Sequence, residues 1–414
     1  MLERLGDASL YAAQIERLHA RARGERDGAL LSRMVQDQRR FARILADEVA
    51  RGRWAPEPAV RRRIAADKPR TVFGLALPDR VVHGVIGELL ADAIEPALVD
   101  QVHSYRRGRS PAGAVARFAD YLRRHRRARP DPRDRGLYLL RADVRDYGDS
   151  VPVGPASRLW PMLAGLVGGD PGALALVRAA VMAGLPRERG LPTGSPVATP
   201  LGNLYLSPVD RCLAGAGGFY ARYGDDLLFA HPEREPFDAA RAAAEAELAA
   251  LGLELNSNKL RLVFFTGCGR SGGRLPGAGA VSYLGCRIGF DGAVGLAGDK
   301  LSALRADLAR RIARTAAALA GENLESRGRA LGAVVAAALD PSAPLAVRQA
   351  PALRALVTDR RQLGELDAWL WRALAAALTG ERGVRALRAV PPRRLRAWGL
   401  PSLVAARNRG RRRP

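Results

Sequence analysis

The stretch FYARYGDDLLFA, residues 219–230, decides the fold. Two β-prone apolar runs flank Gly224 and Asp225, which are both turn formers, so the pattern predicts a β-hairpin with this pair at its tip. Asp226 follows directly, and the tip therefore carries two neighbouring carboxylates. An isolated Asp-Asp pair is most often only a polar turn, so its meaning depends on what the rest of the chain brings to it.

A third carboxylate ends the strand predicted upstream. The apolar run GLYLLRADV, residues 136–144, carries Asp143 near its end. Nucleotidyl transfer requires two divalent ions about 4 Å apart, held by rigid carboxylates. If the strand end and the hairpin tip meet in one sheet, Asp143, Asp225 and Asp226 can reach the same ions, which prefer hard oxygen ligands. The sequence thus predicts a site for divalent cations.

Further motifs follow in a fixed order. A Gly/Pro-rich loop, LPTGSPVATPLGN at 191–203, runs into a helical pattern ahead of the hairpin. Behind the hairpin come a helix predicted over 235–251, the tetrapeptide NSNK at 256–259, and VSYLGCRIGFDG at 281–292, which we expect to form a hairpin with Asp-Gly at its tip. The order of these segments is more informative than any one of them.

Taken together, these segments resemble the reverse transcriptases, and specifically the bacterial branch that includes retron, group II intron and defence-associated enzymes. The resemblance covers roughly residues 60–295 and extends to KPRTVFGLALPDRVVHGVI (68–86) and HSYRRGRS (103–110), which look like the fingers motifs. It implies an RNA-directed DNA polymerase of the α/β (α+β) class. The fold would be a right-hand polymerase, with fingers and a palm of antiparallel sheet plus helices, followed by an all-helical thumb and a C-terminal extension.

The resemblance also implies a role for individual residues. Catalysis would fall to Asp143, Asp225, Asp226 and Lys259, the last as the group that protonates the leaving pyrophosphate. The metal site would comprise Asp143, Val144, Asp225 and Asp226 and would hold two Mg²⁺ ions, for which Mn²⁺ can substitute. The substrate-binding residues would be Arg70, Arg106, Tyr147, Gly148, Gly194, Ser195 and Asn203, with the two arginines clamping the triphosphate. Tyr283, Leu284 and Gly285 would form the primer grip.

Some positions depart from the family pattern. Most relatives carry Phe or Tyr five residues after the first catalytic Asp, where the ring clashes with a 2′-hydroxyl, but this chain has Gly148 there. We therefore expect weak discrimination between ribo- and deoxyribonucleotides unless Tyr147 takes over that role. The Gly/Pro-rich loop 191–203 looks like the template-and-substrate loop of the family and is called the substrate loop. In it, Thr193 and Thr199 replace the usual Gln and Ser. The sequence shows neither a retron-type Val-Thr-Gly signature nor a zinc or H-N-H module, which favours a defence-associated or domesticated enzyme.

The expected organisation is a linear series of segments. From about residue 297, leucines at helical spacing with arginines off their face predict amphipathic helices with a basic exterior. The predicted parts are a basic helical N-terminal segment (1–58), fingers (59–135), palm (136–295), helical thumb (296–380) and basic C-terminal extension (381–414).

The net charge of the chain indicates which class of molecule it binds. The 414 residues include 66 Lys+Arg against 42 Asp+Glu, a net charge of +24, which favours a polyanion. The expected partners are an RNA template, a DNA or RNA primer duplex and dNTPs, with a dedicated non-coding RNA or a defence partner protein left open. A template-independent or protein-primed polymerase, and a non-catalytic RNA-binding protein, stay open as alternatives.

The same composition indicates where the protein works. Three widely spaced cysteines disfavour structural zinc and a disulfide framework. The N-terminal residues MLERLGDASL lack a signal-peptide pattern, and no run of apolar residues is long enough to span a membrane. We therefore expect a cytoplasmic protein without membrane association.

Overall fold

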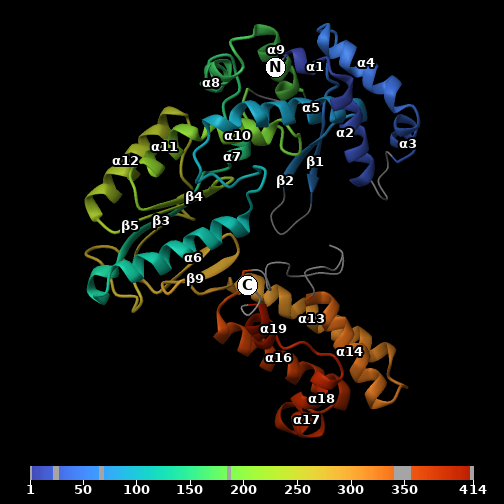
Figure 1. Cartoon of the computed structure of the whole chain (residues 1–414), viewed down its shortest axis with the longest axis vertical. Coiled ribbons are helices and arrows are strands. Elements are labelled where there is room, and N and C mark those ends of the chain that lie inside the picture. The colour runs from blue at the N-terminus through green and yellow to red at the C-terminus, as the bar shows by residue number, and fades with distance from the viewer. Residues whose placement is uncertain (1, 22–27, 65–69, 184–187, 340–355, 411–414) are drawn as a thin grey trace. The chain divides into compact units, whose positions relative to one another are not determined.

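A computed structural model describes residues 2–21, 28–64, 70–183, 188–339 and 356–410. The chain forms two compact units (Figure 1). Unit 1 comprises residues 1–114 and 137–262, and unit 2 comprises residues 115–136 and 263–414. The chain crosses between the two units within one helix at residues 114–115, at residues 136–137, and within one strand at residues 262–263. Each unit is therefore built from separate parts of the sequence.

Unit 1 is mixed α/β. Its helices are α1 (Leu2–Leu5), α2 (Ala8–Arg21), α3 (Gly28–Gln36), α4 (Gln38–Ala50), α5 (Leu77–Ile94), η1 (Glu95–Ala97), α7 (Tyr147–Ser150), α8 (Leu159–Leu166), α9 (Pro171–Met182), α10 (Ala198–Tyr205), α11 (Ser207–Gly215) and α12 (Arg234–Ala250). Its strands are β1 (Val60–Ile64), β2 (Arg70–Gly74), β3 (Leu137–Asp143), β4 (Phe219–Tyr223) and β5 (Asp226–His231).

Three antiparallel strands position the predicted catalytic residues. β5 pairs with β4 on one side and with β3 on the other. Their side chains are almost continuously buried, as in Leu139, Leu228 and Phe229, because helices pack against the strands; α11 and α12 lie along them (Figure 1). The hairpin predicted over 219–230 is confirmed, with Gly224 and Asp225 between the two strands.

One strand of unit 1 is not evident in the sequence pattern. Residues 60–64, VRRRI, form β1 and pair with β2 in a two-stranded antiparallel ribbon. The three consecutive arginines suggest a basic turn, but they lie in a strand, and Arg62 and Arg63 are exposed. The strand therefore lacks the hydrophobic alternation by which strands are usually recognised.

Unit 2 combines a three-stranded sheet with helices. The sheet consists of β8 (Ala280–Tyr283), β9 (Cys286–Gly289) and β10 (Val294–Leu296), whereas the short β7 (Gly277–Ala278) pairs with β6 (Arg261–Phe265). The helices are α13 (Gly298–Ala318), α14 (Leu324–Leu339), α16 (Arg360–Thr379), α17 (Gly383–Ala389), α18 (Pro392–Ala397) and α19 (Leu403–Gly410), with the short η2 (Pro132–Arg135). The helix α6 (Pro111–Ala128) and the strand β6 cross between the units.

The helices of unit 2 share one apolar core. The predicted stripe is confirmed, because Leu304, Leu308 and Ile312 of α13 are buried against residues of α14 and α16. Asp359 caps the start of α16 by accepting hydrogen bonds from Arg361 N and Gln362 N. From residue 298 onward, every regular element in the described part of the chain is a helix. This agrees with the predicted helical C-terminal part.

The segment 281–292 differs in detail from its prediction. Asp291 and Gly292 do form a turn, but it joins β9 to β10. A second turn at Leu284 and Gly285 joins β8 to β9. Both residues have positive φ (48° and 77°), a conformation that costs leucine more than glycine. The segment is thus a three-stranded meander with two turns.

The mixed α/β class with antiparallel strands is confirmed. The boundaries of fingers, palm and thumb stay predictions. Among the described residues, no helix combines the length and apolar character that crossing a membrane requires.

Candidate active site

The strands of unit 1 bring the predicted catalytic carboxylates together. Asp143, the last residue of β3, is the direct cross-strand partner of Asp226, the first residue of β5. Val144 N donates to Asp225 O over 3.1 Å, which ties the end of β3 to the hairpin tip. Asn256 N donates to Asp143 O over 2.7 Å. The backbone of all three acids is therefore fixed by hydrogen bonds.

Cations contact two of these carboxylates. Lys259 Nζ lies 2.5 Å from Asp143 Oδ1, and Arg141 Nη2 lies 3.3 Å from Asp226 Oδ1. The Lys259 side chain is 40% exposed, whereas that of Asp143 is 9% exposed. Lys259 can therefore reach solvent or substrate from a position beside a carboxylate that has little access to water.

The carboxylates at the hairpin tip are destabilised in their ionised form by burial and by one another. Burial raises the pKa of Asp225, and the Asp143 and Asp226 charges raise it further. Burial also raises the pKa of Asp226, with Arg141 opposing the shift and Asp143 adding to it. Each raised pKa means that the folded protein disfavours the ionised form. A bound cation would relieve this penalty.

The donor set fits a divalent cation. Aspartate oxygens are the hard ligands that Mg²⁺ and Mn²⁺ prefer, and the three acids already interact electrostatically. In the described part of the chain, no group of three or more His, Cys, Asp or Glu side chains is arranged as a closed metal site. Lys259 and Arg141 contact Asp143 and Asp226, so an entering ion would compete with them for these carboxylates.

A buried polar network stabilises the turn of the hairpin at residues 219–230. Arg222 of β4 is 1% exposed and forms a two-pronged ion pair with Asp210 of α11, with both contacts at 2.7 Å. Arg222 Nη1 also donates to Gly224 O over 2.9 Å and to Asn203 Oδ1 over 3.1 Å. Burial alone lowers the pKa of Arg222, but Asp210 more than offsets this and raises it. One arginine thus fixes the turn that precedes Asp225.

Asn203 connects this network to another loop. Its Nδ2 donates to Ser104 O over 2.8 Å, and Ser104 Oγ accepts a hydrogen bond from Gly224 N. Asn203 therefore has a structural role, since it joins α10 to the loop before α6 and to the hairpin; its role in substrate binding stays a prediction.

The substrate loop packs on buried groups of α5. Ser195 is buried, and its Oγ lies 2.8 Å from Nδ1 of His83, a residue that is itself fully buried. Burial lowers the pKa of His83 to about 4, so this imidazole is neutral at physiological pH. Gly194 has φ of 99°, which a side chain would strain, and Thr193 O accepts from Phe73 N.

Tyr147 and Gly148 lie in the short helix α7. The Tyr147 hydroxyl donates to Gly202 O over 2.5 Å, which holds the half-buried ring against α10. A Cβ added at Gly148 would lie 3.2 Å from Thr193 Oγ1, a tight contact. Thr193 therefore occupies part of the space that a larger residue at 148 would need.

Of the two arginines predicted to clamp the triphosphate, the structure describes the side chain of one, Arg106. Arg70 begins β2, and its side chain lies outside the described residues. Arg106 is almost completely buried, with its guanidinium on Glu95 and on the carbonyls of Val99 and Val102. These contacts use four of its five N–H groups, so they give Arg106 a scaffold role. Its role as a triphosphate clamp stays a prediction.

The predicted primer grip belongs to unit 2. Tyr283 ends β8 with a fully buried ring, while Leu284 and Gly285 form the turn. The structure assigns these residues to a rigid hairpin, and their role in gripping a primer stays a prediction.

Sequence reasoning missed Arg222, Asp210, Ser104 and His83. Arg222 was detectable in principle, because a charged residue two positions after Tyr220 shares the face of a strand that is otherwise apolar. A buried charge requires a partner, and Asp210 is the acid in the first turn of the preceding helix. The other two show no signal in the sequence.

Comparisons with known proteins agree with these motifs. Residues 159–288 match the family model described as reverse transcriptase (RNA-dependent DNA polymerase). The match includes Asp225, Asp226 and Lys259 but begins after Asp143. It supports the prediction that the chain is an RNA-directed DNA polymerase. No curated protein matches the chain.

Similar solved structures are telomerases. Apo telomerase from Candida tropicalis truncated from the C-terminal domain is 12% identical, with a TM-score of 0.42, over 58% of this chain and 55% of that chain. Telomerase from Candida albicans in complex with a fragment of telomeric RNA is 10% identical, with a TM-score of 0.46, over 86% and 61%. Apo telomerase from Candida tropicalis is 10% identical, with a TM-score of 0.45, over 83% and 69%. The chain thus spans less than two thirds of the first two.

Proposed function

We propose that this protein is a reverse transcriptase that adds nucleotides to a primer 3′-hydroxyl on an RNA template. The observation that carries the proposal is the fixed juxtaposition of Asp143, Asp225 and Asp226, in a chain of which residues 159–288 match the reverse transcriptase model. Carboxylates that repel one another at the end of a sheet are suited to holding cations, because a cation removes the repulsion.

Each residue then has a defined task. Asp143, Asp225 and Asp226 would hold two Mg²⁺ or Mn²⁺ ions, with Val144 beside them; when bound, such ions activate the attacking hydroxyl and neutralise the leaving phosphates. Lys259 Nζ would supply a proton to the departing pyrophosphate from its partly exposed position beside Asp143. Arg222 positions the hairpin tip without meeting the substrate.

The proposal also covers the branch of the family, the cellular location and the partners. We place the chain in the bacterial branch with retron, group II intron and defence-associated enzymes, acting in the cytoplasm. Its partners would be an RNA template, a DNA or RNA primer and dNTPs, together with a non-coding RNA or a defence partner protein. The net charge of +24 supports partners rich in phosphate.

Primer extension tests the function directly. The purified protein should extend a DNA primer annealed to RNA in the presence of Mg²⁺ and dNTPs, and the double variant Asp225→Ala/Asp226→Ala should not. Extension that ignores the template sequence would instead indicate a template-independent polymerase. RNA binding without any extension would indicate a non-catalytic RNA-binding protein.

Gly148 leads to a prediction about the sugar. Without a ring at this position we expect dNTPs to be preferred over rNTPs by no more than about a hundredfold, because a pocket that merely tolerates a hydroxyl rejects it weakly. Competition between dNTPs and rNTPs in single-nucleotide incorporation measures the ratio. Tyr147→Phe is the matched control, because it removes the bond to Gly202 and keeps the ring. A much stronger deoxy preference that survives Tyr147→Ala would contradict this prediction.

A further inference from the structure

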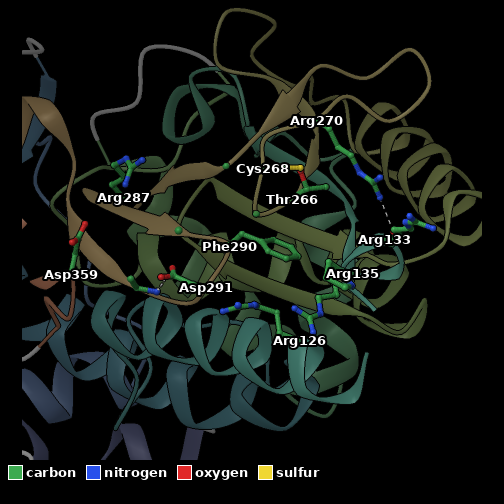
Figure 2. A pocket seen from close by; sticks show the side chains of 15 residues that line it. Arg126, Arg133, Arg135, Thr266, Cys268, Arg270, Arg287, Phe290, Asp291 and Asp359 are labelled. Atoms are coloured by element: carbon green, nitrogen blue, oxygen red, sulfur yellow. Dashed lines mark hydrogen bonds between the residues drawn. The ribbon is translucent and has the colours of Figure 1, made fainter. Parts of the chain in front are cut away.

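Unit 2 contains an arginine-lined pocket that the catalytic proposal does not use. The cavity of about 600 Å³ is formed by the end of α6, the short helix η2, the segment 266–270 and the β9–β10 hairpin, with Asp359 at its edge (Figure 2). None of the predicted catalytic, substrate or primer-grip residues lines it. Its size falls within the range of pockets that hold small ligands or short segments of a polymer.

The pocket has an excess of positive charge. Five arginines line it, against two acids, Asp291 and Asp359. Both acids are already engaged by backbone N–H groups, because Asp291 accepts from Ala293 N and Asp359 accepts from Arg361 N and Gln362 N. The acids are therefore held at helix and turn starts and do not pair with the arginines.

Three of the five guanidiniums have no partner among the described residues. Arg126, Arg133 and Arg287 make no side-chain hydrogen bond or ion pair with any residue in the described ranges. Arg135 and Arg270 donate only to backbone carbonyls, among them Arg133 O, and so keep their full charge. Figure 2 shows these arginines rising from several elements around Phe290. Phe290 lines the pocket, is 5% exposed and packs edge-to-face on Phe265, so its ring is held in place.

The basic surface continues beyond this pocket. A second, more open cavity is lined only by arginines, namely Arg123, Arg126, Arg127 and Arg135. Arg126 and Arg135 belong to both cavities. Arg123 is held by Asp120 and by Gly292 O, whereas Arg127 is exposed. Two cavities that share two arginines form one tract, which is longer than a single phosphate requires.

We propose that this tract binds the phosphate backbone of a single nucleic acid strand. Arginine suits phosphate because its planar fork can donate two parallel hydrogen bonds. The repeat of free guanidiniums along two adjoining cavities fits a ligand with repeated phosphates better than one isolated anion. The identity of the strand as RNA rests on the proposed function, while the site itself belongs to unit 2.

Salt-dependent binding provides the first test. The variant Arg126→Gln/Arg133→Gln/Arg287→Gln removes three unpartnered charges, so it should fold like the wild type. Its control is Arg382→Gln/Arg385→Gln/Arg388→Gln, which removes equal charge from exposed residues in and beside α17. For a single-stranded RNA of about 20 nucleotides, three lost phosphate contacts should make the slope of log K against log salt shallower by about 2. The control should keep the wild-type slope.

Cys268 provides a local readout in the same pocket. Its thiol is exposed, and a hydrogen bond from the backbone of Arg270 is the largest cause that lowers its pKa, with a smaller contribution from Thr266. Iodoacetamide should therefore modify Cys268 faster than the buried Cys286. Bound RNA should slow this modification at least about tenfold in the wild type and in the control variant, and not in the pocket variant.

The proposal would be overturned if the pocket variant kept either the wild-type salt slope or the wild-type protection of Cys268 by RNA. Protection of Cys268 by pyrophosphate or a nucleoside triphosphate at equal phosphate concentration would also overturn it, in favour of a site for small anions. All measurements use the full chain with Asp225→Asn, without metal or dNTPs, so that failure here leaves primer extension by the wild type as an independent result.

Discussion

Asp225→Asn is expected to reduce primer extension by at least about a thousandfold and, without metal, to raise the melting temperature. The loss of activity follows because Asp225, at the hairpin tip, is a proposed ligand of the metal ions. The gain in stability has a separate cause. Burial and the Asp143 and Asp226 charges raise the pKa of Asp225, so ionisation stabilises the unfolded chain more than the folded one. At a pH where the wild-type carboxyl is ionised, the neutral amide avoids this penalty.

Thermal unfolding with and without Mg²⁺ checks both parts of this prediction. Since an ion that binds only the folded state stabilises it, Mg²⁺ should raise the melting temperature of the wild type and have little effect on the variant. The advantage of the variant without metal should shrink as the pH falls through the raised pKa, because the wild-type carboxyl then becomes neutral. The matched control is Asp149→Asn, which changes an exposed acid of the same unit. A lower melting temperature for metal-free Asp225→Asn would contradict the electrostatic argument.

Asp210→Ala is expected to cost about 3–5 kcal/mol of unfolding free energy, the largest effect on stability that we anticipate. The variant leaves the Arg222 guanidinium buried without its charged partner, and it also removes the acceptor of the Tyr220 hydroxyl. Arg222 would then seek water or another acceptor and release Gly224 O. Extension activity should fall further than the folded fraction does, because the turn before Asp225 loses its support.

Urea unfolding measures the unfolding free energy of Asp210→Ala, and two other variants serve as comparisons. Asp238→Ala removes an exposed partner of Arg234 in α12 and should cost less than about 0.5 kcal/mol. The double variant Asp210→Leu/Arg222→Met removes both charges and should cost less than Asp210→Ala, because no buried charge remains unpaired. If Asp210→Ala cost no more than Asp238→Ala, the network would not hold the hairpin.

Local patterns were sufficient for several elements of the fold. The hairpin at 219–230, the strand ending at Asp143 and the helix over 235–251 all occur where the sequence indicates them, within a few residues. Turn residues, apolar runs and helical periodicity are properties of neighbouring residues, so they can be detected without tertiary structure. The ribbon strand at 60–64 escapes the same reasoning because it lacks alternation.

For this protein, the sequence by itself determined the residue types at the candidate site and their order along the chain, including Asp143, the Asp225–Asp226 pair and Lys259. Only the tertiary structure decided which groups meet: the Asp143–Asp226 register, the Lys259 contact, and the buried Arg222–Asp210 pair beneath the turn. It also showed Arg106 in a scaffold and arginines from distant segments around one pocket. The physical reason is that charges interact through space, whereas sequence patterns report only on neighbours along the chain.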